Sequence, residues 1–303
     1  MATVADKLSE QDPTRVRTVY WPAIAWFGIL LIAVYYPILS RLVMQWSTDD
    51  DVSHGFFVPV VAGYIVWQRR ETLLRTEWKP AWWGMGILVW ASLQAYLGML
   101  GAELFLQRTA FLISLVGMLL VLGGTGVVRQ LSFPLLLLLF MIPIPTVIYN
   151  QITFPLQLFA SSVAERSLDM MNIPVLQNGN ILELASQKLS VAEACSGIRS
   201  LLSLSFLSLV YAYFFDRKVW MRWVLLIATI PIAIIANSAR VTLTGVFSEI
   251  NTELAQGFFH EAEGWVIFVV ALVMLVIFHQ FLNWVYRRFH KEPGMPNEGA
   301  SLA

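Results

Sequence analysis

The sequence predicts an all-α polytopic membrane protein of about eight transmembrane helices, with a small extracytoplasmic α/β insertion before the sixth. The chain is 57% hydrophobic and only 13% charged, with a mean hydropathy of +0.66, whereas soluble domains carry roughly 25% charged residues. Its apolar residues also gather in runs of the length that a membrane helix requires. We expect the helices at residues 20–44, 55–68, 82–100, 103–122, 131–149, 198–215, 220–237 and 265–284.

Residues 150–194 depart from this pattern and form the predicted insertion. Apolar residues at helical spacing, with charges between them, predict an amphipathic helix over 152–171 that lies at the membrane interface. Residues 174–191 then alternate around Asn178-Gly179. Asn-Gly between apolar runs indicates a β-hairpin. We therefore expect a small β element that leads the chain to Cys195.

The basic residues predict the orientation in the membrane. With residues 1–19 inside as a polar tail and eight spans, the inside segments hold 14 of the 20 Lys and Arg residues, as the positive-inside rule requires. Residues 20–285 then form the membrane domain, 286–303 form a second cytoplasmic tail, and both termini are cytoplasmic. Residues 150–194 and 241–264 lie outside. The first apolar run has no small-residue cleavage site and is predicted to be a retained helix.

Composition also excludes several classes of function. The formal net charge is zero, so nothing indicates a nucleic-acid partner. A single cysteine excludes an internal disulfide and a cysteine-based metal cluster. The four histidines show no metal-ligand spacing. We predict no metal and no cofactor.

The one cysteine, Cys195, lies where a polar segment meets the apolar run 198–215. Glu193, Ser196 and Arg199 surround it with polar groups, and Ser196-Gly197 breaks the chain just before the predicted helix. A thiol at a helix N-terminus beside cations has a lowered pKa and becomes a nucleophile. The alternative is a small buried hydrophobe, which is what a lone cysteine in a membrane protein usually is.

Two further residues are predicted to share the depth of Cys195. The turn between the sixth and seventh helices is centred at 217.5, and Cys195 and Arg240 are equally far from it in sequence. At 1.5 Å per residue both lie about 33 Å from the inner turn, at the outer membrane edge. His260 lies just before the eighth predicted helix, on the same side. The trio fits a cysteine nucleophile, a histidine base and a cation that stabilises thiolate or oxyanion.

Several residues are weaker candidates for substrate binding or support. Asn237 and Ser238 could orient Arg240, Glu193 could bind Arg199 or Arg240, and His54 could line a substrate groove. For each the alternative is a solvated or packed polar residue. Arg240 alone could be an arginine that snorkels to the interface, although its predicted outer position opposes the positive-inside tendency.

These motifs together resemble the exosortase family. They are Glu193-x-Cys195-Ser196-Gly197-Ile198-Arg199-Ser200, Asn237-Ser238-x-Arg240, His260-x-x-x-Gly264-Trp265 and Asp50-x-Val52-Ser53-His54-Gly55-Phe56. The resemblance covers roughly residues 20–285. It implies a bacterial inner-membrane cysteine transpeptidase whose active site faces the periplasm, with Cys195, Arg240 and His260 as catalytic residues. It further implies exported substrate proteins with a C-terminal Pro-Glu-Pro sorting signal, a transmembrane helix and a basic tail, in exopolysaccharide-producing bacteria.

A non-enzymatic function remains as the competing hypothesis. Arg240 could instead bind an anionic substrate in a membrane transporter, or the chain could be a scaffold for exopolysaccharide export. A transporter predicts broken helices that meet at the bilayer midplane, whereas the polar residues here gather at the predicted outer edge. Membrane lipids are expected partners under either hypothesis.

Overall fold

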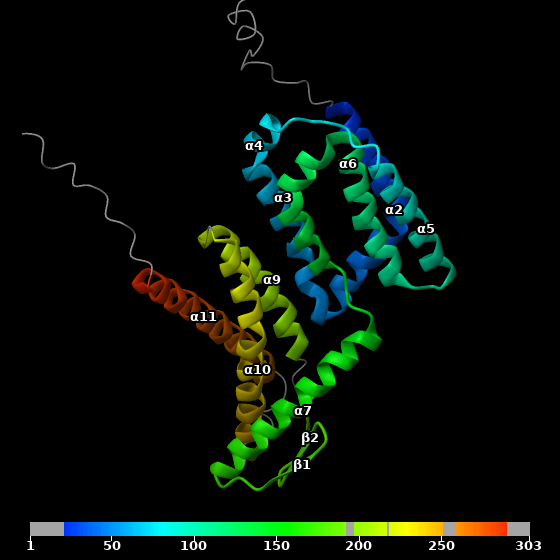
Figure 1. The fold of residues 1–303 in the computed structure, drawn as a ribbon. Helices are drawn as coiled ribbons and strands as arrows, with labels where there is room; N and C mark the ends of the chain where they lie inside the picture. Colours follow the sequence, from blue (N-terminus) through cyan, green and yellow to red (C-terminus); the bar gives the residue numbers. More distant parts are fainter. Residues whose placement is uncertain (1–20, 192–196, 217, 251–257, 290–303) are drawn as a thin grey trace, which may run out of the picture. The chain divides into compact units, whose positions relative to one another are not determined.

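The computed structural model describes residues 21–191, 197–216, 218–250 and 258–289. The chain divides into two compact units, Met1–Pro145 and Thr146–Ala303. Both are built almost entirely from helices, and a small sheet belongs to the second (Figure 1). The prediction of a helical membrane protein with a small α/β element is confirmed.

The first unit is a set of helices joined by short turns. Its elements in order are α2 (Trp21–Thr48), η1 (Asp50–Phe56), α3 (Phe57–Gln68), α4 (Arg70–Arg75), α5 (Gly84–Leu100), α6 (Leu104–Leu137) and η2 (Leu138–Met141). Helices α5 and α6 pack closely because glycines leave room: a Cβ on Gly84 would lie 2.8 Å from Leu120 Cβ, and one on Gly117 2.9 Å from Leu88 Cγ. Small residues at such contacts are typical of membrane helix pairs.

Helix α6 is two helical segments separated by a kink at Gly124. This glycine has φ +82°, which a residue with a Cβ rarely adopts. A Cβ there would also lie only 1.8 Å from the carbonyl oxygen of Lys79. The sequence predicted a helix end at this point, and the structure confirms the break.

The second unit combines long helices with a three-stranded antiparallel sheet. Its elements are α7 (Thr146–Met170), β1 (Val175–Asn178), β2 (Ile181–Leu184), β3 (Lys188–Ser190), α9 (Gly197–Phe215), α10 (Val219–Ile250) and α11 (Phe258–Phe289). The predicted hairpin is confirmed, with Asn178 paired to Ile181. Gly179 has φ +65°, which suits the first central position of a type II′ turn.

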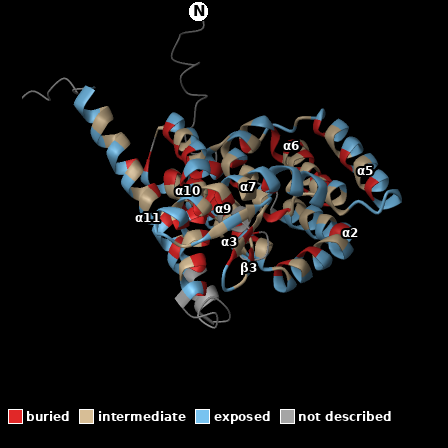
Figure 2. Ribbon diagram, turned by 90° about the horizontal axis from the view of Figure 1, so that it is seen from below, coloured by how far each residue is buried: buried red, intermediate tan, exposed pale blue. Residues whose placement is uncertain are grey.

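Four described helices are long and apolar enough to cross a membrane, not the predicted eight. They are Pro22–Thr48, Leu104–Met141, Val219–Glu249 and Trp265–Phe289. The count is lower than eight because α3 has only 12 residues, and because the two helices that meet at the Gly124 kink fall within one span, Leu104–Met141. Helices Gly84–Leu100 and Leu201–Phe215 are apolar but shorter. Large apolar side chains remain exposed along α2, α5 and α11 (Figure 2), as lipid-facing surfaces require.

A buried polar network joins three elements at the turn between α9 and α10. His279 Nε2 donates to Asp216 Oδ2 at 3.1 Å, the hydroxyl of Tyr211 is 2.9 Å from His279 Nδ1, and Asp216 Oδ1 accepts from the Lys218 amide at 2.7 Å. Both Asp216 and His279 are buried. The expectation that His279 is hydrogen-bonded within its helix bundle is confirmed.

Replacing Asp216 with alanine is expected to destabilise the second unit. Burial alone would raise the pKa of the Asp216 carboxyl, but the Lys218 amide, His279 and the Lys218 charge together hold this pKa below its ordinary value. The carboxylate therefore stabilises the fold at neutral pH, and this contribution is lost as pH falls through the lowered pKa. Leaving the buried donors unsatisfied costs about 1–3 kcal/mol. Thermal unfolding of the full chain in detergent measures it, with exposed Asp169→Ala as control. Equal melting of the two variants at neutral pH would contradict it.

Candidate active site

Helices α9 and α10 pack antiparallel with the register that the sequence predicts. If Cys195 lies opposite Arg240, then residue 205 should lie opposite residue 230. In the structure Ser205 Oγ is 3.1 Å from Thr229 Oγ1, and both residues are buried. The register is therefore within one residue of the prediction. Apolar side chains of α9, α10 and α11 pack around this pair in one core.

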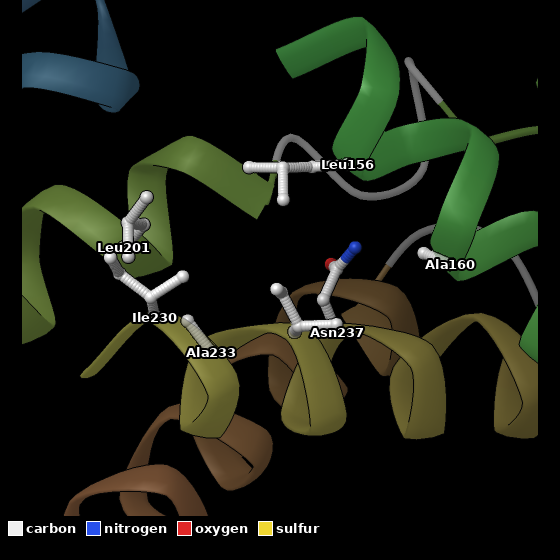
Figure 3. Close-up of a pocket in the computed structure, with 7 residues that line it drawn as sticks. Leu156, Ala160, Leu201, Ile230, Ala233 and Asn237 are labelled. Carbon is white, nitrogen blue, oxygen red and sulfur yellow. The ribbon is translucent and has the colours of Figure 1, made fainter. Parts of the chain in front are cut away.

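A small cavity lies where α9 begins, and a buried amide points into it. The cavity has a volume of about 20 Å³ and is bounded by α7, α9 and α10 (Figure 3), which is room for about one water molecule. Asn237 is 8% exposed. Its amide points toward Leu156 and Ala160 of α7, and Leu201 of α9 lines the same cavity. The predicted supporting residue Asn237 thus lies in a cavity that α9 also lines.

Helix α10 continues well beyond Arg240. The predicted helix ended at residue 237, whereas α10 runs to Ile250. Residues 241, 244, 245 and 248 are buried, which is the i, i+3, i+4, i+7 spacing of a helix face that packs. The sequence prediction therefore ended this helix too early, although the spacing of its packing residues was visible in the sequence.

The sheet and α7 are fixed to this outer part of α10. Val241 lies in one apolar cluster with Leu168 of α7, Leu182 and Leu184 of β2, and Leu189 of β3. A Cβ on Gly245 would lie 2.9 Å from Leu168 Cδ1. The turn after β2 is held as well, because Glu249 Oε1 accepts from the hydroxyl of Ser186 at 2.7 Å and from its amide at 3.1 Å. Sequence reasoning did not predict this attachment.

The chain is anchored on both sides of the segment that contains Cys195. Before it, Val191 is fully buried in the same cluster as Val241, and its amide donates to the carbonyl of Asn180 at 2.9 Å. After it, Leu201 packs at the cavity with Asn237. Val241 directly follows Arg240, so both anchors contact α10 within one turn of Arg240.

The predicted site residues are described to different extents. Glu193, Cys195 and Ser196 lie outside the described residues. Arg199 belongs to the first turn of α9, and for this residue only the backbone is placed. Ser238 is buried and donates to the carbonyl of Ile234 at 2.9 Å. Their functional roles stay predictions.

Arg240 and His260 both belong to helices. Arg240 is half-buried on α10, and its carbonyl accepts from the Thr244 hydroxyl at 3.0 Å. His260 was predicted to lie in a loop before a helix that begins at residue 265. Instead α11 begins at Phe258, so the backbone of His260 lies in the first turn of the helix. The apolar run begins only at Trp265, which is why sequence reasoning placed the helix start too late.

His54 belongs to the first unit and is half-buried in η1. Its Nε2 donates to the carbonyl of Phe140 at 3.2 Å. Burial lowers the pKa of His54, although hydrogen bonds with the Phe140 and Asp51 backbones act in the opposite direction. A substrate-binding role for His54 stays a prediction. Within the part of the chain that the structure describes, no group of three His, Cys, Asp or Glu side chains could hold a metal ion.

Long apolar helices with exposed apolar faces define a helical membrane protein. A model of the transmembrane exosortase family (Exosortase_EpsH) matches residues 46–277. The chain therefore belongs to the transmembrane exosortase family. No curated protein and no solved structure matches it.

Proposed function

We propose that this chain is a membrane-embedded cysteine transpeptidase with Cys195, Arg240 and His260 as its catalytic residues. The observation that carries the proposal is the anchoring of Val191 and Leu201 against α10 on either side of Arg240. Cys195 is four residues from Val191, a reach of at most about 14 Å. We therefore expect the thiol of Cys195 to lie in the neighbourhood of Arg240.

The depth of Arg240 supports chemistry at the membrane edge. Arg240 comes 21 residues after Val219, the first residue of α10, and so lies about 32 Å along the helix axis. The hydrocarbon core is about 30 Å thick. A substrate anchored by its own transmembrane helix would present the peptide beside that helix at this level.

The proposed reaction exchanges one acyl bond for another. His260 takes the proton of the Cys195 thiol, and the thiolate attacks the scissile carbonyl. Arg240 stabilises the thiolate or the developing oxyanion. The C–N bond breaks, His260 returns the proton to the leaving amine, and a thioester remains. An acceptor nucleophile then attacks the thioester, gives up its proton and releases Cys195.

The proposed substrates are exported proteins with a C-terminal Pro-Glu-Pro sorting signal and a transmembrane helix, processed at the outer face of the bacterial inner membrane. We assign supporting or substrate-binding roles to His54, Glu193, Ser196, Arg199, Asn237 and Ser238. Co-expression with a tagged candidate substrate tests the proposal. The expected result is a substrate whose C-terminal mass is reduced by the sorting signal and increased by the acceptor. An unchanged mass for every candidate tested would contradict it.

The proposed topology makes a separate prediction about labelling. In a Cys195→Ala background, a cysteine at exposed Arg166 of α7 should react with a membrane-impermeant thiol reagent added to intact cells. A cysteine at Val219, which is 62% exposed at the opposite end of α10, should react only after permeabilisation. The physical reason is the predicted segregation of 14 of 20 basic residues to the inside. Labelling of Val219→Cys in intact cells would overturn this topology.

A further inference from the structure

A large groove lies between α2, α5 and α6 of the first unit, and none of the proposed catalytic residues is among its lining residues. Its volume is about 830 Å³ and most of its lining is apolar. Along α2 it extends from Phe27 to Arg41, a length of about 21 Å along the helix. Ala95 lines it from α5 and Gln107 from α6. A single hydrogen bond, between the hydroxyls of Tyr35 and Ser114 at 2.9 Å, joins α2 to α6 at its wall.

The Arg41 end of the groove holds positive charge without a counter-ion. Arg41 is exposed at the wall and makes no hydrogen bond or ion pair with any residue in the described ranges. Glu103, the acidic residue directly before α6, does not pair with Arg41. Its side chain caps its own helix by accepting from the Phe105 amide at 3.3 Å. An arginine binds a phosphate well, through two parallel charge-assisted hydrogen bonds.

Arg108 provides an independent indication of an anion. It comes one turn after Leu104 and directly after Gln107, both of which line the groove. Its side chain is buried, with the residue only 4% exposed, and its Nε has no hydrogen-bond partner. It likewise forms no ion pair with a described residue. A buried donor such as this Nε costs free energy when it has no hydrogen-bond partner, and an anion bound beside it would supply one.

We propose that this groove is a binding site for an anionic phospholipid, with its phosphate at Arg41 and Arg108 and its acyl chain along α2. An acyl chain fits the apolar walls and removes a void that would otherwise forfeit packing.

The test measures lipid retention by native mass spectrometry of the full chain in detergent. Phosphatidylglycerol and phosphatidylcholine with identical acyl chains are the probes. The wild type should retain phosphatidylglycerol preferentially, and Arg41→Gln should weaken retention about fivefold. Arg75→Gln, which removes an exposed cation of the same unit, should leave retention unchanged. Ala95→Trp should reduce retention of both lipids because it fills the groove without changing its charge.

The outcomes separate the possible occupants. Equal retention of the two lipids, or retention unaffected by Arg41→Gln and Ala95→Trp, would overturn the proposal. Displacement of the lipid by inorganic phosphate alone would show an anion site without a chain-binding groove and would overturn it too. A dimer mass that the lipid dissociates would identify a second copy of the chain as the occupant. Because Arg108→Gln could fail to fold, the decisive comparison uses exposed Arg41.

Discussion

Replacing Cys195 with alanine is expected to abolish substrate processing while leaving the protein folded and in the membrane. The chain contains no other thiol, so no second cysteine can take over the nucleophilic step. Alanine fits any site that a small cysteine fills, so stability should change little. Cys195→Ser should retain little or no activity because a hydroxyl needs stronger deprotonation before it attacks. The processed fraction of a tagged substrate in membranes measures both variants.

The same variant separates an enzyme from a transporter or scaffold. A catalytic thiolate in the wild type should react rapidly with a thiol probe, whereas a buried structural cysteine should hardly react. Membrane level and melting temperature of Cys195→Ala serve as the controls for folding. Normal processing by a well-folded Cys195→Ala protein would exclude the cysteine mechanism and favour the non-enzymatic hypothesis.

The sequence correctly predicted the structural features that depend on only a few neighbouring residues. Asn178-Gly179 indicated a hairpin because glycine adopts positive φ, and the strands pair around it. The glycines at 123 and 124 indicated a helix break for the same reason. The antiparallel register of α9 and α10 followed from two apolar runs around a short polar turn. The hydrogen bond between Ser205 and Thr229 confirms it to within one residue.

A predicted helix end was wrong where packing against the rest of the protein, and not contact with lipid, stabilises the helix. Residues 241–250 lie beyond the predicted helix end at residue 237, yet they are helical, and Val241 and Gly245 pack on the α7 and β-strand cluster. The count of eight spans failed for a different reason. Hydropathy alone cannot tell a short helix such as α3 from a full span.

The sequence also did not predict which residues form hydrogen bonds with the buried polar side chains. Nothing in the sequence pairs Asp216 with His279, 63 residues away, because their contact depends on how α11 packs against the α9–α10 turn. The attachment of Ser186 to Glu249 is likewise non-local. Arg108 is buried in α6, and nothing in the sequence around it predicted this burial. Residues of this kind can be recognised only in a structure, because the sequence does not show which charged side chains are buried.

Replacing Arg240 with lysine distinguishes a catalytic arginine from a snorkelling one. A lysine also reaches the interface, so a residue that only snorkels should tolerate the change. A guanidinium directed at a thiolate or oxyanion should not, because only arginine offers a planar fork of donors. Loss of one such donor typically reduces the rate by about 10²–10³. We therefore expect Arg240→Lys to reduce the initial rate of substrate processing in membranes by this factor.

His260→Ala tests whether His260 is the base, through the pH dependence of the residual rate and the coupling of His260 to Arg240. If His260 is the base, its loss should cost at least as much as that of Arg240, and the residual rate should no longer depend on pH near neutrality. Residues that act as one catalytic unit are non-additive. The double variant should then be scarcely slower than the slower single variant, with buried Asp216→Ala as a control for a purely structural loss. Near wild-type processing by Arg240→Lys, together with a fully additive double variant, would leave Cys195 as the only catalytic residue of the three.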